Sequence, residues 1–220
     1  MSFVEVLHVY EDREPHSAAF NMALDEALFA TQRLPAIRFY RWRRPSLSFG
    51  YFGAFAEVAD QMDAREVVRR WTGGGIVFHG SDLTYSVILP RSNGTRPSRS
   101  PIVYEEIHRA MQRALAPHLD LELAHADAPK VSASCFANPV AADLLADGQK
   151  IAGAAQRRTR TGLLHQGSIQ CGSLPADFVD AFASALCPSY EERELSSDVL
   201  TRAEELAKTK YGTAEWLRQR

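Results

Sequence analysis

The amino-acid sequence predicts an α+β protein in which mixed or antiparallel β-sheets carry helices packed on them. Strand patterns occur in two groups, over residues 37–89 and 132–171, with few helical patterns inside either group. Helical patterns precede, separate and follow these groups. A chain of 220 residues can bury a core without a disulfide or a metal, so we expect one domain over residues 1–220.

The first elements are expected to be one helix and two strands. Ser17 is a favourable N-cap residue before a segment with apolar side chains at helical spacing. Asp25 and Glu26 lie on this helix, and as isolated acids they are expected to be exposed or to cap it, without a functional role. Residues 37–42 alternate apolar and cationic side chains, which predicts a half-buried strand, and residues 46–51 predict its neighbour.

The later elements follow from the same patterns. A short helix is expected at 59–66, strands at 76–78 and 83–89, and a flexible surface loop at 90–99. The remaining predicted elements are a helix from Ser100, strands at 132–136, 144–147, 150–157 and 163–171, and helices at 176–186 and 197–208.

Composition and charge exclude several classes of protein. The net charge is −2, which suggests no general affinity for nucleic acid. No apolar run approaches the roughly 18 residues of a membrane span, and the acidic N-terminal segment does not resemble a secretory signal, so a cytoplasmic protein without a membrane partner is expected. Local basic clusters are either solvated surface or a docking face for acidic proteins. They lie at residues 38–44, 65–70, 91–99 and 157–160.

Two segments carry the functional signal. Gly73, Gly74 and Gly75 precede an apolar run, which predicts a tight connection or a close approach of the backbone to another group. In the second segment, Lys150 enters an apolar strand beside small residues and has no obvious partner. Asp147-Gly148 before it predicts a two-residue hairpin turn.

Together these segments resemble the biotin/lipoate protein ligase and lipoyl/octanoyl transferase superfamily, and the resemblance implies the catalytic-domain fold of that superfamily. The matching residues are Arg70 to Gly75 with His79, Gly148 to Gln156 and His165 to Ser168, with further matches at Asn21 to Ala27 and Lys210 to Trp216. The segment from Ser132 to Pro139 is similar to the catalytic cysteine segment of the cysteine-dependent Gram-positive-type octanoyltransferases.

The resemblance implies the chemistry and the site residues. Cys135 would accept an octanoyl or lipoyl group from the thioester of an acyl carrier protein and pass it to a lysine of a lipoyl domain or of glycine-cleavage H protein. Lys150 would position the acyl carbonyl and stabilise the thiolate of Cys135. This reaction requires no cofactor. The substrate-binding residues implied are Arg70, Gly73, Gly74, Gly75, His79, Gly153, Ala154, Ala155 and His165.

Several alternatives remain open from the residues alone. Cys135 could be a small buried apolar residue, and His79 could be either a pocket residue or a satisfied core histidine. Cys171 and Cys187 match no motif, and the three cysteines and the histidines show no spacing typical of a metal site.

Two other functions remain open beside acyl transfer. The second hypothesis is an ATP-dependent lipoate–protein ligase, which uses ATP and Mg²⁺ to form an acyl-adenylate. A chain ending at residue 220 is not expected to carry the accessory C-terminal domain of many ligases. A non-catalytic acyl-binding relative is the third.

Overall fold

A mixed sheet of eight strands forms the centre of the computed structural model, which describes residues 3–91, 99–129, 132 and 135–219. The strand order is β11-β1-β2-β6-β10-β9-β8-β7. Strand β1 pairs in parallel with both of its neighbours, and the other pairs are antiparallel. The bounds are β1 Leu7–Glu11, β2 Ala36–Tyr40, β6 Leu83–Pro90, β7 Glu122–Leu123, β8 Leu144–Ala146, β9 Gln149–Arg158, β10 Gly162–Ile169 and β11 Tyr190–Glu192.

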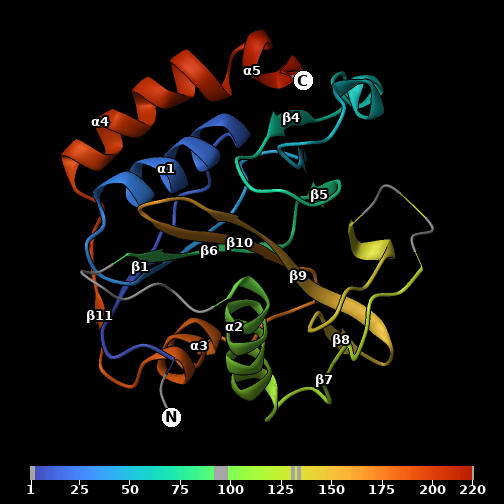
Figure 1. The fold of residues 1–220 in the computed structure, drawn as a ribbon, viewed down its shortest axis with the longest axis vertical. Coiled ribbons are helices and arrows are strands. Elements are labelled where there is room, and N and C mark those ends of the chain that lie inside the picture. The colour runs from blue at the N-terminus through green and yellow to red at the C-terminus, as the bar shows by residue number, and fades with distance from the viewer. Residues whose placement is uncertain (1–2, 92–98, 130–131, 133–134, 220) are drawn as a thin grey trace.

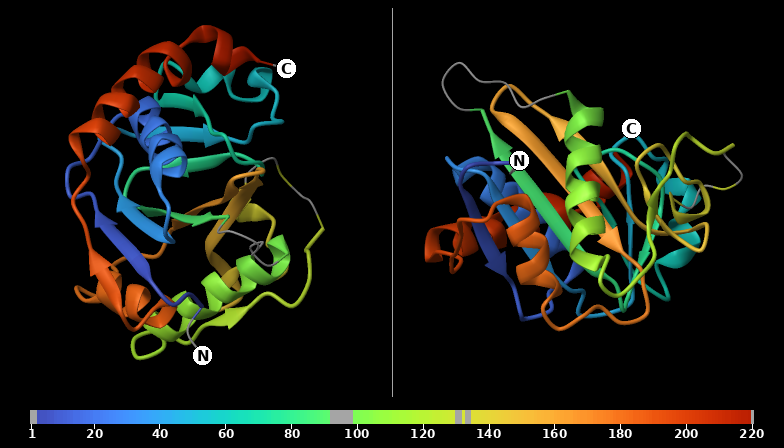
Figure 2. Two further views of the ribbon diagram at one scale, coloured as in Figure 1. Left: turned by 60° about the vertical axis from the view of Figure 1, so that its left-hand side comes forward. Right: turned by 90° about the horizontal axis from the view of Figure 1, so that it is seen from below.

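Helices cover both faces of this sheet, as Figures 1 and 2 show. Helices α1 (Ala18–Thr31) and α4 (Ser197–Leu206) pack on one face, and α2 (Ser100–Leu115) and α3 (Phe178–Leu186) pack on the other. A π-helical turn (Ala207–Tyr211) and helix α5 (Ala214–Arg218) close the described chain. The predicted α+β class with mixed sheets is therefore confirmed. None of the helices described is both long enough and apolar enough to cross a membrane.

A second sheet of three strands lies beside the C-terminal helices (Figure 1). Its order is β4-β3-β5, with β3 at Ser46–Phe49, β4 at Glu66–Arg69 and β5 at Val77–His79. The prediction of a short helix at 59–66 is wrong. Two 3₁₀ turns, Phe55–Glu57 and Ala59–Gln61, occupy this region, and β4 begins where the helix was expected to end.

Strand β2 was expected to be half-buried, but both of its faces are covered. Ile37 and Phe39 pack toward α2 and α3, whereas Ala36 and Tyr40 pack toward α1 and α4. Arg38 between them is fully buried, because two carboxylates and the Tyr40 ring surround it. Arg38 is therefore part of a buried polar layer, whereas Arg41, the second cation of the pattern, is exposed just beyond the strand.

Three further sequence expectations have clear outcomes. The helix bearing Asp25 is confirmed, but Asp25 is completely buried, so its placement at the surface or as a cap is wrong. The strand expected at 132–136 is also wrong, since Cys135–Ala137 forms a 3₁₀ turn, η3. The Asp147-Gly148 hairpin is confirmed, with φ of 49° and 71° as a type I′ turn requires. The predicted loop at 90–99 lies largely outside the described residues.

Candidate active site

The turn η3 places Cys135 beside the glycine segment. The backbone N–H of Cys135 donates a hydrogen bond of 2.8 Å to the carbonyl oxygen of Ile76, and Ile76 is the residue that follows Gly75. The cysteine is half-buried, so its thiol is not a sequestered core group. Two segments far apart in sequence thus meet at Cys135.

Lys150, the second residue of β9, brings a cation to this thiol. Its Nζ lies 3.6 Å from Cys135 Sγ and donates a hydrogen bond of 3.1 Å to the Cys135 carbonyl oxygen. An ammonium group at this distance stabilises a thiolate, which is the nucleophilic form of cysteine. The side chains of the two predicted catalytic residues are therefore in contact.

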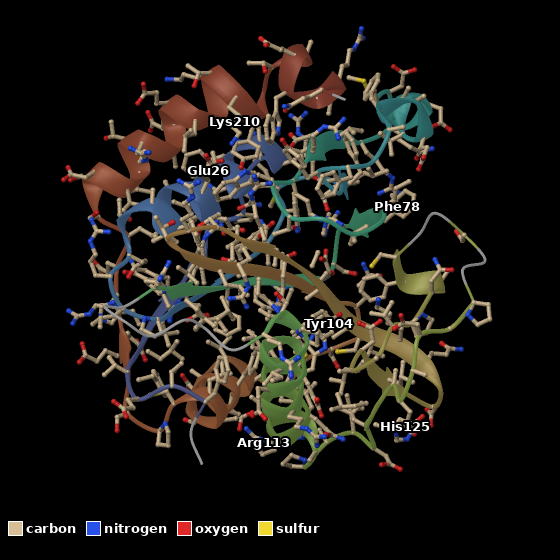
Figure 3. The ribbon with its side chains drawn as sticks, in the orientation of Figure 1. Glu26, Phe78, Tyr104, Arg113, His125 and Lys210 are labelled. Atoms are coloured by element: carbon tan, nitrogen blue, oxygen red, sulfur yellow. The ribbon has the colours of Figure 1, made fainter. Side chains whose placement is uncertain are left out.

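The partner of Lys150 is Asp143, which the sequence analysis did not find. Asp143 Oδ2 lies 2.7 Å from Lys150 Nζ, and the two side chains are at most 1% exposed. The hydroxyl of Tyr104 and the backbone N–H of Val140 also donate to this carboxylate. Figure 3 shows Tyr104 projecting from α2 toward the strands that carry the site. A signal existed in the sequence: a lysine in an apolar strand needs a counter-ion, and an acid stands at the start of the preceding strand.

Gly153 is explained by the side chain of Lys150. A Cβ atom at position 153 would lie 2.2 Å from Lys150 Cε, 2.5 Å from Nζ and 3.0 Å from Asp143 Oδ1. Glycine is therefore required here to leave space for an ion pair, whereas its backbone conformation is ordinary. Ala154 and Ala155 follow on the same strand and line the hollow described below.

Arg70 shapes the glycine segment. Its guanidinium donates to the carbonyl oxygens of Gly73 and Gly75, at 2.7–3.1 Å, and to Ser48 Oγ at 3.2 Å. Burial lowers the pKa of Arg70 to about 10, so the group stays charged at neutral pH. Gly74 has φ +84° and no room for a Cβ, which would lie 2.8 Å from Arg70 Nη2, whereas a Cβ at Gly73 would meet nothing.

An inner hollow and an open groove meet at Cys135. The hollow reaches among mostly buried side chains toward the α1 face of the sheet, and the groove lies among more exposed residues; both spaces are partly open to solvent. Cys135 and Ala154 line both spaces. The hollow is lined further by Met22, Tyr40, Trp42, Ser48, Arg70, Val77, His79, Thr84, Gly153, Ala155, Gln166, Gly167 and Ser168. The groove is lined further by Phe49, Gly50, Phe52, Gly53, Ala54, Glu57, Gly74, Gly75, Ile76, Asp127, Ala128, Asn138, Val140 and Lys150.

His79 combines the two roles that the sequence left open. It lines the inner hollow, and its ring nitrogens lie 2.8 Å from Asp82 Oδ2 and 2.8 Å from Ser48 Oγ. The Trp42 ring stacks on it at 3.9 Å between centroids. Burial lowers the pKa of His79, although the bond to Asp82 opposes this shift. His79 is thus a fully bonded buried residue that also forms the cavity wall.

His165 lies elsewhere. It is completely buried among α2-facing residues and lines neither the hollow nor the groove in the described part of the chain. Its ring nitrogens lie 3.2 Å from the Tyr85 hydroxyl and 3.0 Å from the Gln156 amide nitrogen, and His108 lies 3.1 Å from the same hydroxyl. The geometry gives no support to the prediction that His165 binds substrate. It belongs to a buried network that packs beneath the ion pair.

This network is expected to make the protein sensitive to acid. Burial lowers the pKa of His108 to about 4, opposed by its bond to the Ala142 carbonyl. In the unfolded chain His108 takes up a proton near pH 6.5, whereas in the folded protein it does so only near pH 4. The free energy of unfolding therefore falls as the pH decreases through this interval. The loss from this residue is about 3 kcal/mol in the free energy of unfolding. Urea titrations of His108→Gln at several pH values should show a shallower loss than the parent.

The matched control is His118→Gln, because His118 lies exposed beyond the end of α2. It should retain the acid sensitivity of the parent. An equally steep loss in His108→Gln would contradict the assignment of the effect to His108.

The chain is similar to known proteins over most of its length. Residues 17–207 match the model of the lipoyl protein ligase A/B catalytic domain. Octanoyltransferase LipM of Oceanobacillus iheyensis is 38% identical over 169 residues, which cover 72% of this chain and 62% of that protein. Octanoyltransferase LipM of Anoxybacillus flavithermus is 30% identical in an alignment that covers 91% of this chain and 94% of that protein. The first of these matches thus spans less than two thirds of the relative's length.

Solved structures show the same fold. A lipoate-protein ligase A bound with ATP superposes with a TM-score of 0.76 at 22% identity, over 99% of both chains. A bipartite lipoate protein ligase from Thermoplasma acidophilum, described with its E2 lipoyl domain, gives a TM-score of 0.74 at 20% identity, over 97% of this chain and 96% of that one. At these identities the likeness concerns the fold.

Proposed function

Because the chain belongs to the lipoyl protein ligase A/B catalytic-domain family, we propose that it is an acyltransferase of protein lipoylation. In this proposal, residues 1–220 act as one catalytic domain in the cytoplasm. The domain moves an octanoyl or lipoyl group from the thioester of an acyl carrier protein to a lysine of a lipoyl domain or of glycine-cleavage H protein. The names of the LipM relatives support octanoyl transfer. The E2 lipoyl domain described with a structural neighbour supports a lipoyl domain as acceptor.

The contact between Cys135 and Lys150 carries the proposal. The Cys135 thiolate attacks the thioester carbonyl, a new S–C bond forms, and the carrier's thiolate leaves. The acceptor amine then attacks the acyl-enzyme, an N–C bond forms, the bond to Cys135 breaks, and the amine proton returns the departing sulfur to a thiol. Each step exchanges one acyl bond for another, so the proposed reaction requires no nucleotide and no metal.

Each group around Cys135 would have a separate role in the proposed reaction. The ammonium of Lys150, 3.6 Å from Sγ, stabilises the thiolate both as nucleophile and as leaving group. Backbone groups of the glycine segment would stabilise the oxyanion that forms at the acyl carbonyl. The inner hollow would hold the acyl chain, with a contribution of about 0.8 kcal/mol for each buried methylene. The open groove would admit the donor and the acceptor.

Intact-mass analysis tests this function directly. The protein is incubated with octanoyl-carrier protein without ATP or Mg²⁺, and peptide mapping locates any adduct. We expect one octanoyl group on Cys135, which disappears when a lipoyl domain is added and reappears on the acceptor lysine. Acylation of the acceptor only when ATP and Mg²⁺ accompany the free acid would instead establish the ligase reaction. No acylated acceptor under either condition would establish a non-catalytic relative.

A further inference from the structure

A buried carboxylate on the α1 face of the sheet gathers four side-chain donors. Asp25 is 0% exposed and has no contact with the inner hollow. Its Oδ1 accepts from Arg38 Nη1 and Ser86 Oγ, each at 2.8 Å. Its Oδ2 accepts from the Tyr40 hydroxyl at 3.0 Å and from Gln166 Nε2 at 2.7 Å. So many bonds on one acid at the centre of the molecule fix its position.

The bond to Asp25 determines which way the Gln166 amide faces. Asp25 is paired with Arg38, and a carboxylate in an ion pair only accepts hydrogen bonds, so the NH₂ group of Gln166 points toward it. The amide oxygen of Gln166 therefore points the opposite way, where it accepts a hydrogen bond of 2.8 Å from Thr72 Oγ1. Reversal of the amide would place its oxygen against the carboxylate of Asp25, and neither group could donate to the other. The charge on Asp25 thus orients a polar group that lines the hollow.

Thr72 connects Gln166 to the glycine segment. It is fully buried, it immediately precedes Gly73, and its carbonyl oxygen accepts a hydrogen bond of 2.8 Å from the backbone N–H of Tyr51. Arg70 holds the carbonyls of Gly73 and Gly75 from the other side. The hydroxyl of Thr72 is the side-chain link from this segment to the sheet through Gln166.

We infer that Asp25 is a positioning residue for the glycine segment and acts on it through Gln166 and Thr72. The inference rests on the proposed function, because it assumes that this segment supports the acyl carbonyl while Cys135 is acylated. Asp25 itself does not touch the acyl group. Its effect is on the oxyanion that forms at the carbonyl and not on the reactivity of the thiol.

The first test removes the last bond of the series with little change in volume. In Thr72→Val, we expect acylation of Cys135 by octanoyl-carrier protein to slow by about 10- to 100-fold. This loss is smaller than the loss of rate that follows removal of an oxyanion donor itself, because Thr72 acts only on the position of the segment. Alkylation of Cys135 by iodoacetamide forms no oxyanion, so its rate should stay within about twofold of the parent. Thr72→Ser restores the hydroxyl and should restore the acylation rate. The control Ser86→Ala removes a different donor from Asp25 and should acylate normally.

The second test asks whether Asp25 and Thr72 act through the same series of hydrogen bonds. Asp25→Asn should slow acylation as Thr72→Val does, and the double variant should be no slower than the slower single variant, because both changes break the same series. Multiplicative effects in the double variant would overturn the inference. So would acylation of Thr72→Val at the parental rate, a measurement that stands even if Asp25→Asn fails to fold. If the parent protein forms no adduct on Cys135, the proposed function fails first, and the two failures are distinguished.

Discussion

Replacement of Cys135 by serine is expected to abolish acyl transfer, with a loss on the order of 10³-fold or more. Serine has the size of cysteine, but its hydroxyl stays protonated beside Lys150, because an ammonium at 3.6 Å cannot offset the high cost of ionising an alcohol. The measurement is transfer of octanoyl from carrier protein to a lipoyl domain, followed by mass spectrometry of the acceptor.

The other two cysteines provide matched controls. Cys187 is buried at the end of α3, and burial raises the pKa of the Cys171 thiol, which disfavours its thiolate. Cys171→Ser and Cys187→Ser should keep the parental rate of transfer, apart from any loss of folded protein. Undiminished transfer by Cys135→Ser would show that the reaction does not pass through this thiol.

Replacement of Gly153 by alanine is expected to have the second largest effect on activity, a loss of about 10²-fold. The added Cβ would occupy the space of Lys150 Cε and Nζ, so the ammonium must leave its position between Asp143 and Cys135. The readouts are the rate of Cys135 acylation and the thermal midpoint of unfolding, which should also fall because Asp143 is left buried without its partner.

Gly172→Ala is the appropriate control for this substitution. A Cβ at position 172 would meet nothing within 4 Å, so the variant should acylate and melt as the parent does. A fully active Gly153→Ala would show that the position of the ammonium has no bearing on acyl transfer.

The sequence predicted the elements of the site better than their connections. Lys150, Cys135 and the glycine segment were identified through the resemblance to the ligase and transferase superfamily, and the structure brings them together. Asp143 was missed, because its pairing with Lys150 depends on the register of the β8–β9 hairpin and on a turn in which Ala142 adopts φ 67°. Asp25 was misjudged for a related reason: its partners come from β2, β6 and β10, which are distant in sequence.

Local patterns also failed where the chain has no regular structure. The small and apolar residues at Cys135–Ala137 have the composition of a strand, yet they form a 3₁₀ turn, held by bonds from the Cys135 backbone to Ile76 and Lys150. The burial of Arg38, Arg69 and Arg70 was likewise hidden, since a basic cluster has the same composition whether it is solvated or enclosed. The guanidinium groups of Arg38 and Arg69 meet acceptors that are distant in sequence, whereas that of Arg70 bonds the carbonyls of the adjacent Gly73 and Gly75 together with Ser48.

The junction of the hollow and the groove has a consequence for the order of events. In the described part of the chain, Cys135 faces one space that leads inward and one that leads to solvent. If the acyl chain occupies the first, the donor protein and the acceptor protein must both approach through the second. They cannot be bound to the same thiol together, so each must leave before the other arrives. On the proposed function, an excess of either protein should therefore inhibit turnover by occupying the form of the enzyme that the other requires.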